Sequence, residues 1–335
     1  MLFTILSMLG GLVFLTLGAE GLIRGAVSLA QRFGLSPLLI GLTIVGFGTS
    51  TPELVASLNA AWAGNSGIAV GNVVGSNIFN ILVILGLTAL VRKIKIAKAA
   101  WRQSGMVMLL ATGLAVLTFS YIPAMPRWVG SVWFALLLAY LAWEYWLHSR
   151  PHKKGTVEPE PVVEIIKMPL FAALGLIAAG LVGLILGAQL LVDGAVSLAQ
   201  LWGVSDTIIG LTIVAGGTSL PELATSVMAA LRKQPEIAVG NIIGSNIFNL
   251  LGILGLTALV LPTPIPASIV AFDMWVMAAA AVAFMLYARV GWRLTRAEGG
   301  LFLAAYGLYT AYLIHHAAPA LPATTSLLTT MPFVG

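Results

Sequence analysis

Two glutamates stand inside long apolar segments of this chain, each directly after a proline. Glu53 lies in the sequence GTSTPEL, and Glu222 lies in GTSLPEL. An ionisable side chain within an apolar membrane segment is costly to bury, so such residues usually serve a function. Carboxylate oxygens are hard ligands that suit Ca²⁺ and Na⁺, and two facing carboxylates would neutralise one Ca²⁺. The two glutamates therefore predict a cation site in the protein interior.

The residues before each glutamate favour an interrupted helix. Proline removes a backbone donor from a helix interior and clashes with the carbonyl one turn earlier, and the preceding glycines favour non-helical backbone. We expect breaks near Thr49–Pro52 and Thr218–Pro221. A break frees carbonyl oxygens, which in a membrane must be buried in protein or line a cavity. These carbonyls are further candidate ligands for a hard cation.

A second polar motif follows each glutamate, GNVVGSNIFN at 71–80 and GNIIGSNIFN at 240–249. Ser76 and Asn80 are four residues apart and share a helix face, as do Ser245 and Asn249. Their hydroxyl and amide oxygens complement carboxylates in a cation site. Small polar residues in membrane helices also serve helix packing alone. That alternative stays open for Ser57, Ser226, Asn72 and Asn241.

Both motifs belong to one internal repeat. Residues 41–90 and 210–259 align without a gap at an offset of 169, and 33 of the 50 positions are identical. A shorter match, GAVSLAQ at 25–31 and 194–200, keeps the same offset. Self-similarity over this length indicates two related structural halves, each carrying one glutamate.

Composition places these motifs in a membrane. The chain has 335 residues, of which 59% are hydrophobic and 9% charged, whereas soluble domains carry about a quarter charged residues. The net charge of +5 is better explained by basic cytoplasmic loops than by nucleic-acid binding. The absence of cysteine excludes disulfides and thiolate metal sites. The first apolar segment lacks a basic n-region and a cleavage site, so we interpret it as a membrane span.

The apolar runs predict an all-α integral membrane protein with ten spans. These are about 3–31, 38–62, 67–91, 103–122, 128–147, 169–200, 207–231, 237–260, 267–288 and 299–318. Spans one and six are unusually long and must tilt. We expect spans two, three, seven and eight to be broken. The polar stretch 148–168 divides the chain into a first half, 1–147, and a second half, 169–335.

The distribution of Lys and Arg predicts the orientation. With both termini outside, fifteen basic residues fall on the cytoplasmic side, including those of the 148–168 linker, against Arg127 alone in an outer loop. Five spans, an odd number, separate equivalent points of the two repeats, so the second half is inverted relative to the first. Inverted repeats around a midplane site are typical of secondary transporters. We expect a multi-pass protein of the plasma membrane.

The remaining ionisable groups in the spans favour structural roles. Glu20 and Arg24 are spaced i, i+4 and are expected to pair. Asp193 aligns with Arg24 under the repeat, and Asp273 lies early in span nine. The pair His315 and His316 near the end of the last span has no further ligand at zinc-site spacing.

The motif pairs GTSTPEL with GNVVGSNIFN, and GTSLPEL with GNIIGSNIFN, resemble the α-repeats of the cation/calcium exchanger superfamily, above all its prokaryotic sodium/calcium exchanger branch. The resemblance spans the chain and implies four cation positions between spans two, three, seven and eight. It assigns Glu53 and Glu222 to Ca²⁺ and Na⁺ together, and the carbonyls of Thr49 and Thr218 to Ca²⁺. It places Ser50, Ser76, Gly46 and Glu222 at one Na⁺ position, Ser219, Ser245, Ala215 and Glu53 at its counterpart, and Asn80 and Asn249 near the centre. Some relatives have Asp at one of these last two positions, whereas this chain has Asn at both.

The resulting hypothesis is an antiporter that exchanges Na⁺ for Ca²⁺ by alternating access. The resemblance implies three Na⁺ per Ca²⁺ and net charge movement. We expect no enzymatic activity, no cofactor besides the transported ions, and a monomer in the lipid bilayer. Two alternatives remain: coupling of Ca²⁺ to H⁺ or K⁺, and a passive cation channel or a cation sensor. A channel needs a continuous pore, whereas inverted broken helices favour a single occluded site.

Overall fold

The protein folds as a bundle of helices, seen in a computed structural model that describes residues 2–148, 168–202 and 215–317. Within these residues, seven helices are long and apolar enough to cross a membrane, or eight if one bent pair counts as a single span. The predicted all-α membrane fold is therefore confirmed. The predicted tenth span corresponds to α17 (Arg296–Ala317), which falls outside this set because Gly, Tyr and His lower its hydropathy.

The first part of the chain consists of α1 (Leu2–Phe33), α2 (Pro37–Ile40), η1 (Gly41–Val45), α3 (Gly46–Thr49), α4 (Thr51–Trp62), α5 (Ser66–Phe79), η2 (Asn80–Leu85), α6 (Gly86–Val91), β1 (Ile94–Lys95), α7 (Lys98–Ala100), η3 (Trp101–Gly105), α8 (Met106–Tyr121), β2 (Ala124–Met125) and α9 (Arg127–His148). The second part consists of α10 (Leu170–Leu201), α12 (Ala215–Gly217), α13 (Leu220–Leu231), α14 (Pro235–Ile247), η5 (Phe248–Leu254), α15 (Gly255–Val260), β3 (Thr263–Pro264), η6 (Ile269–Asp273), α16 (Met274–Arg289), β4 (Arg293–Leu294) and α17. The η elements are π-helical segments. The predicted linker lies almost wholly outside the described residues, so the division into halves stays a prediction.

The second predicted span is bent where its sequence predicts a break. The helices Pro37–Thr49 and Thr51–Trp62 meet at an angle of 42°. Ser50 has left the helical region, with φ −82° and ψ 8°, and Pro52 stands in the first turn of α4. Ser219 adopts nearly the same conformation, φ −89° and ψ 8°, before α13. The expected break in span seven is thus seen on its α13 side, while residues 207–214 of that span lie outside the described residues.

Spans three and eight do not show the expected breaks. Each runs as one continuous helix, from Gly67 to Val91 and from Pro235 to Val260. The Gly and Asn residues of these spans leave every backbone donor in place, unlike a proline. The irregularity takes the form of π-helical segments instead, η2 and η5, each beginning at or beside the last Asn of the motif.

The repeat offset of 169 also relates the short strands. Ile94 pairs with Leu294 between β1 and β4, and Met125 pairs with Thr263 between β2 and β3. Adding 169 to Ile94 gives Thr263, and subtracting 169 from Leu294 gives Met125. The repeat offset therefore converts the first pair into the second. The two halves therefore make reciprocal contacts.

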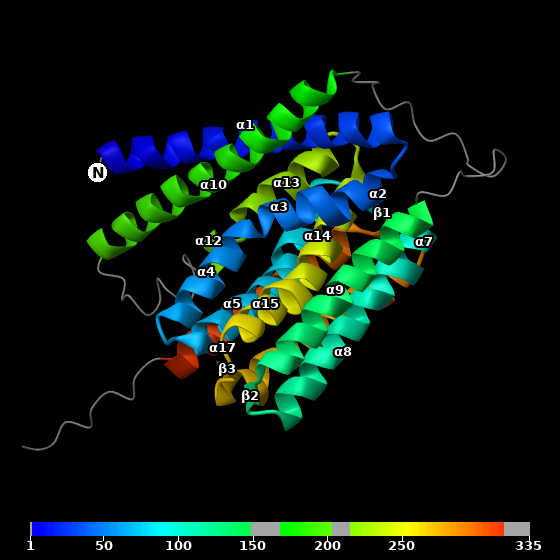
Figure 1. The fold of residues 1–335 in the computed structure, drawn as a ribbon. Helices are drawn as coiled ribbons and strands as arrows, with labels where there is room; N and C mark the ends of the chain where they lie inside the picture. The colour runs from blue at the N-terminus through cyan, green and yellow to red at the C-terminus, as the bar shows by residue number, and fades with distance from the viewer. Residues whose placement is uncertain (1, 149–167, 203–214, 318–335) are drawn as a thin grey trace, which may run out of the picture.

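The polar repeat helices form the centre of the molecule and the long helices its periphery. We compare the most apolar 18-residue stretch of each helix. Of its residues, 72% are buried in Gly67–Val91 and 83% in Pro235–Val260, against 28% in α1 and 33% in α10. Figure 1 shows α1 and α10 side by side along one edge of the bundle, running in opposite directions. Both have 32 residues, which confirms that spans one and six are unusually long.

Small residues let α1 and α10 approach closely. A Cβ added at Gly18 would lie 2.8 Å from the carbonyl oxygen of Gly180, and one added at Gly11 would lie 2.8 Å from that of Gly187. Both distances are below normal contact, so the helices pack backbone against backbone. Close approach through small residues is the usual basis of helix association in membranes.

This packing predicts that Gly18→Val destabilises the protein by about 1–3 kcal/mol, because the new side chain has no room against α10. Thermal unfolding of the purified protein in detergent measures the change. Gly10→Val is the matched control, since a Cβ at Gly10 in the same helix would meet nothing within 4 Å. Equal losses for the two variants would contradict the packing argument.

Candidate cation site

Both repeat glutamates lie in the first turn of a half-helix, Glu53 in α4 and Glu222 in α13. Each residue is only 1% exposed. The N-terminal end of a helix carries a partial positive charge that favours a nearby carboxylate. The helix breaks therefore bring two favourable helix ends, each with its own acid, into the protein interior.

Each glutamate is held by a serine from the opposite half. Ser50 Oγ donates to Glu222 Oε1 at 2.7 Å, and Ser219 Oγ donates to Glu53 Oε1 at 3.0 Å. Ser50 immediately precedes α4, which carries Glu53, and Ser219 immediately precedes α13, which carries Glu222. The crossed bonds bring the two acids into one site, as the sequence predicts.

Two asparagines anchor the half-helices to their neighbours. Asn72 Nδ2 donates to the Glu53 carbonyl at 3.3 Å and to Ser57 Oγ at 3.0 Å. Asn241 makes the equivalent bonds to the carbonyl of Glu222 and to Ser226, at 3.2 and 2.8 Å. For these four polar residues the helix-packing alternative is therefore the one that their contacts support.

Several buried oxygens of the site have no hydrogen-bond partner. They are Glu53 Oε2, Glu222 Oε2, Asn80 Oδ1, Asn249 Oδ1 and Thr218 Oγ1. Asn80 begins η2, which packs against α13, and Asn249 lies in η5, which packs against α4. Buried polar atoms are nearly always paired, and an unpaired buried carboxylate is especially costly. Carboxylate, amide and hydroxyl oxygens are the kinds of ligand that Ca²⁺ and Na⁺ prefer.

The other predicted site residues lie around these groups. The Thr49 hydroxyl lies 3.2 Å from Asn241 Oδ1 and 3.0 Å from the Val45 carbonyl oxygen, and these two acceptors share its one hydrogen. Ser245 Oγ donates to the carbonyl of Gly46 at 3.1 Å. The hydroxyl oxygens of Ser76 and Ser219 lie 3.3 Å apart, within hydrogen-bond distance. Ala215 is the first residue of α12, where the described residues resume. That any of the twelve residues binds an ion stays a prediction.

One bridge across the centre was not foreseen. Asn77 accepts from Asn249 Nδ2 at 3.0 Å and donates through its own amide to the Asn246 carbonyl at 3.3 Å. It connects the two central helices of the repeats, α5 and α14 with η5. The motif contains Asn77, but the i, i+4 spacing indicates only Ser76 and Asn80.

The site is not a cluster of acids. Within the described residues, no three His, Cys, Asp or Glu side chains lie close enough together to hold a metal ion. Asp273 is engaged elsewhere, accepting from Tyr309 at 2.9 Å, which supports the structural role expected for it. Two carboxylates among neutral oxygens are a low-charge site, suited to a cation that must bind and leave.

Comparison with known proteins agrees with this architecture. The model of the family described as sodium/calcium exchanger protein matches residues 3–146 and 172–315. The chain belongs to the sodium/calcium exchanger family. Its antiport class, its ion-transport role and the predicted resemblance are thereby confirmed, and the family consists of exchangers and not of enzymes.

The similarity to individual relatives extends over nearly the full length of both chains. The chain is 40% identical to CaxA of Alkalimonas amylolytica, over 91% of this chain and 97% of the relative. It is 31% identical to the sodium/calcium exchanger MaX1 of Methanosarcina acetivorans, over 92% and 97%. The structure matches that of the sodium-calcium exchanger NCX_Mj with a TM-score of 0.79 and 32% identity, over 93% of this chain and 99% of the other.

The anchoring bonds predict that Asn241→Ala destabilises the ion-free protein by about 1–3 kcal/mol, since it leaves buried partners unsatisfied. Asn72→Ala should also lower the stability, but by less. Asn241 has a further contact with Thr49, and Asn72 has no equivalent of it. Thermal unfolding in the presence of a chelator measures both. Asn59→Ala, an exposed position on α4, is the control. A normal melting temperature for Asn241→Ala would show that Asn241 is not an anchor.

Proposed function

We propose that this exchanger moves Ca²⁺ against Na⁺ by alternating access, with Glu53 and Glu222 as the residues for which the two ions compete. The observation that carries the proposal is the pair of buried carboxylates, each with one oxygen bound by a serine of the other half and one oxygen without a partner. The printed names of the relatives, sodium/calcium exchanger among them, support the choice of ions.

Charge balance explains the competition. Two ionised carboxylates are neutralised by one Ca²⁺ at a shared central position or by Na⁺ ions at adjacent positions. We assign the carbonyls of Thr49 and Thr218 to Ca²⁺. The flanking Na⁺ positions are bordered by Ser50, Ser76 and Gly46 on one side and by Ser219, Ser245 and Ala215 on the other. A coupling of three Na⁺ to one Ca²⁺ then moves one net charge per cycle.

Asn80 and Asn249 complete the central position. Their side-chain oxygens are buried and without partners, and they are neutral. Adding no charge, they keep the position weaker for cations than a carboxylate would. We infer that this central position is occupied by Ca²⁺ and is emptied or hydrated when Na⁺ is carried.

The architecture proposed for the transporter is ten spans in two inverted halves, in the plasma membrane. The reciprocal strand pairs, serine–glutamate bonds and asparagine anchors all support two halves related by exchange. The distribution of basic residues supports a cytoplasmic position for the loop at Arg232 and Lys233 and an outer position for both termini. One chain contains a whole site, which supports a monomeric transporter.

Movement of α1 and α10 as a unit is the proposed basis of alternating access. The pair is joined backbone against backbone and lies outside the buried centre. Sliding of this pair across the centre would expose the site to one side and then to the other. A rigid crosslink between the pair and the centre should therefore stop exchange.

Radioactive Ca²⁺ uptake into liposomes containing the purified protein tests the proposed coupling. We expect an outward Na⁺ gradient alone to drive uptake, and an inside-positive potential to accelerate it, because Na⁺ leaves with excess charge. Uptake driven by a H⁺ or K⁺ gradient in place of Na⁺ would assign another coupling ion. Uptake indifferent to every countergradient would indicate a channel.

Substitution of either glutamate tests the site itself. Glu53→Gln and Glu222→Gln should each lower Ca²⁺ uptake by at least about tenfold, because one of the two anionic ligands is lost. The proteins should still fold, since Gln preserves the side-chain shape. Asp193→Asn removes an exposed acid from α10 and serves as the control with normal uptake. Near-normal transport in either glutamate variant would place the site elsewhere.

A further inference from the structure

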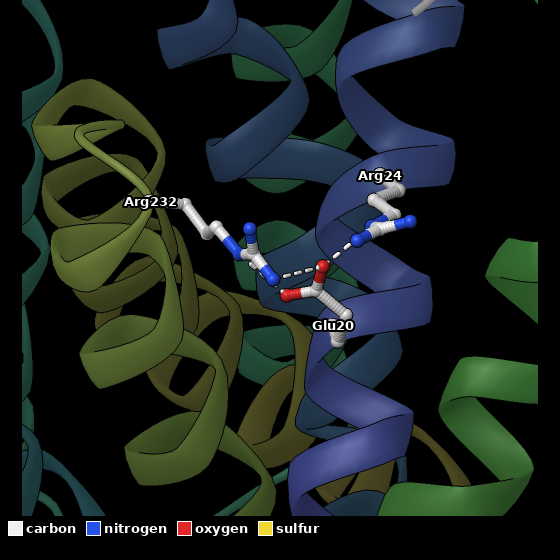
Figure 2. A network of polar contacts seen from close by, with 3 residues as sticks. All are labelled: Glu20, Arg24 and Arg232. Carbon is white, nitrogen blue, oxygen red and sulfur yellow. Dashed lines mark hydrogen bonds and ion pairs between the residues drawn. The ribbon is translucent and has the colours of Figure 1, made fainter.

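Glu20 connects the long helix α1 to the centre of the protein. Figure 2 shows its carboxylate between Arg24 of the same helix and Arg232, which follows α13. Arg232 Nε donates to Glu20 Oε2 at 2.7 Å, and Arg232 Nη2 bonds to Glu20 Oε1. The expected Glu20–Arg24 pair is present as well. The side chain of Glu20 is 17% exposed, and two-point binding by an arginine is the strongest form of ion pair.

The ion pair has no counterpart in the other half. Adding the repeat offset of 169 to Glu20 leads to Gln189, and subtracting it from Arg232 leads to Ala63. No ion pair between these two side chains is possible. The exchange symmetry of the strand pairs and of the serine–glutamate bonds therefore does not extend to this contact between a long helix and a half-helix.

The long helices also cover the two half-helices unequally. On α13, Ala224 and Met228 are partly buried against a hydrophobic cluster built largely by α1. The equivalent residues of α4 are open, with Val55 50% exposed and Asn59 exposed. In Figure 1, α13 lies directly beneath α1 and α10. The long pair therefore covers α13 and leaves α4 uncovered.

We propose that the bond between Glu20 and Arg232 is a latch that stabilises the arrangement in which α1 covers α13. Movement of the long pair toward α4 separates Glu20 from Arg232 and forms no equivalent bond at Gln189 and Ala63. The latch therefore favours one of the two arrangements. With the cytoplasmic placement of Arg232 proposed above, the favoured arrangement leaves the outer half-helix uncovered, so the resting exchanger faces outward.

The latch rests on the proposed alternating access, but its test needs no transport. The chain contains no cysteine, so one introduced thiol reports on one position. Ala224→Cys marks the covered helix, and Val55→Cys marks the equivalent position on the uncovered helix. The rate of reaction with a soluble maleimide is measured for each in detergent with a chelator and without Na⁺. A failed flux assay would thus count against the exchange proposal alone.

Breaking the latch should increase the reaction of the covered position. In the Ala224→Cys protein, Glu20→Gln is expected to raise the labelling rate about fivefold, the upper range for a partly exposed ion pair. Arg232→Gln should do the same, and the double variant should add nothing to the effect of Glu20→Gln, because the Glu20–Arg232 bond is already lost in the single variant. The Val55→Cys rate should stay level or fall.

The matched control is Asp193→Asn, an equal change of charge on α10, which should leave both rates unchanged. An unchanged Ala224→Cys rate in Glu20→Gln would overturn the proposal. So would additive effects of the two latch substitutions, or an equal rise at Val55→Cys, since the latter indicates general loosening of the protein.

Discussion

The structure depends on the burial of two carboxylates in one apolar interior. Each has one oxygen bound by a serine of the opposite half, and its second oxygen is left without a partner. Such a centre is costly when ionised and empty, and a bound cation removes that cost. Under the proposed exchange, the same cost explains coupling: an ion that leaves must be replaced before the site changes access, because the vacant, charged site is the least stable form.

The helix breaks solve the positioning problem that this burial creates. Pro52 and Pro221 begin short half-helices, so each glutamate stands at a helix N-terminus inside the bundle. Asn72 and Asn241 then fix these half-helices to the continuous helices beside them. The continuous helices have no such break, and their Asn side chains reach the half-helices from an uninterrupted backbone.

The centre and the periphery follow different rules. The serine–glutamate bonds and the asparagine anchors of the centre are reciprocal between the two halves. The contact of the long helices with the half-helices is not reciprocal, because Glu20 and Arg232 have no charged equivalents. Under the proposed alternating access, the related halves allow two arrangements, and the proposed latch between Glu20 and Arg232 stabilises one of them.

The sequence by itself determined the membrane class, the two glutamates and the bend before α4, since these follow from hydropathy, from repeat identity and from the missing N–H of a proline. Tertiary structure alone decided which side chains meet across helices: Ser50 with Glu222, Asn249 with Asn77, and Glu20 with Arg232, residues 172 to 212 positions apart. Spacing along a helix predicts neighbours one turn away, as it did for Glu20 and Arg24. It carries no information on which helix packs opposite, because that choice depends on the shape and packing of the whole bundle.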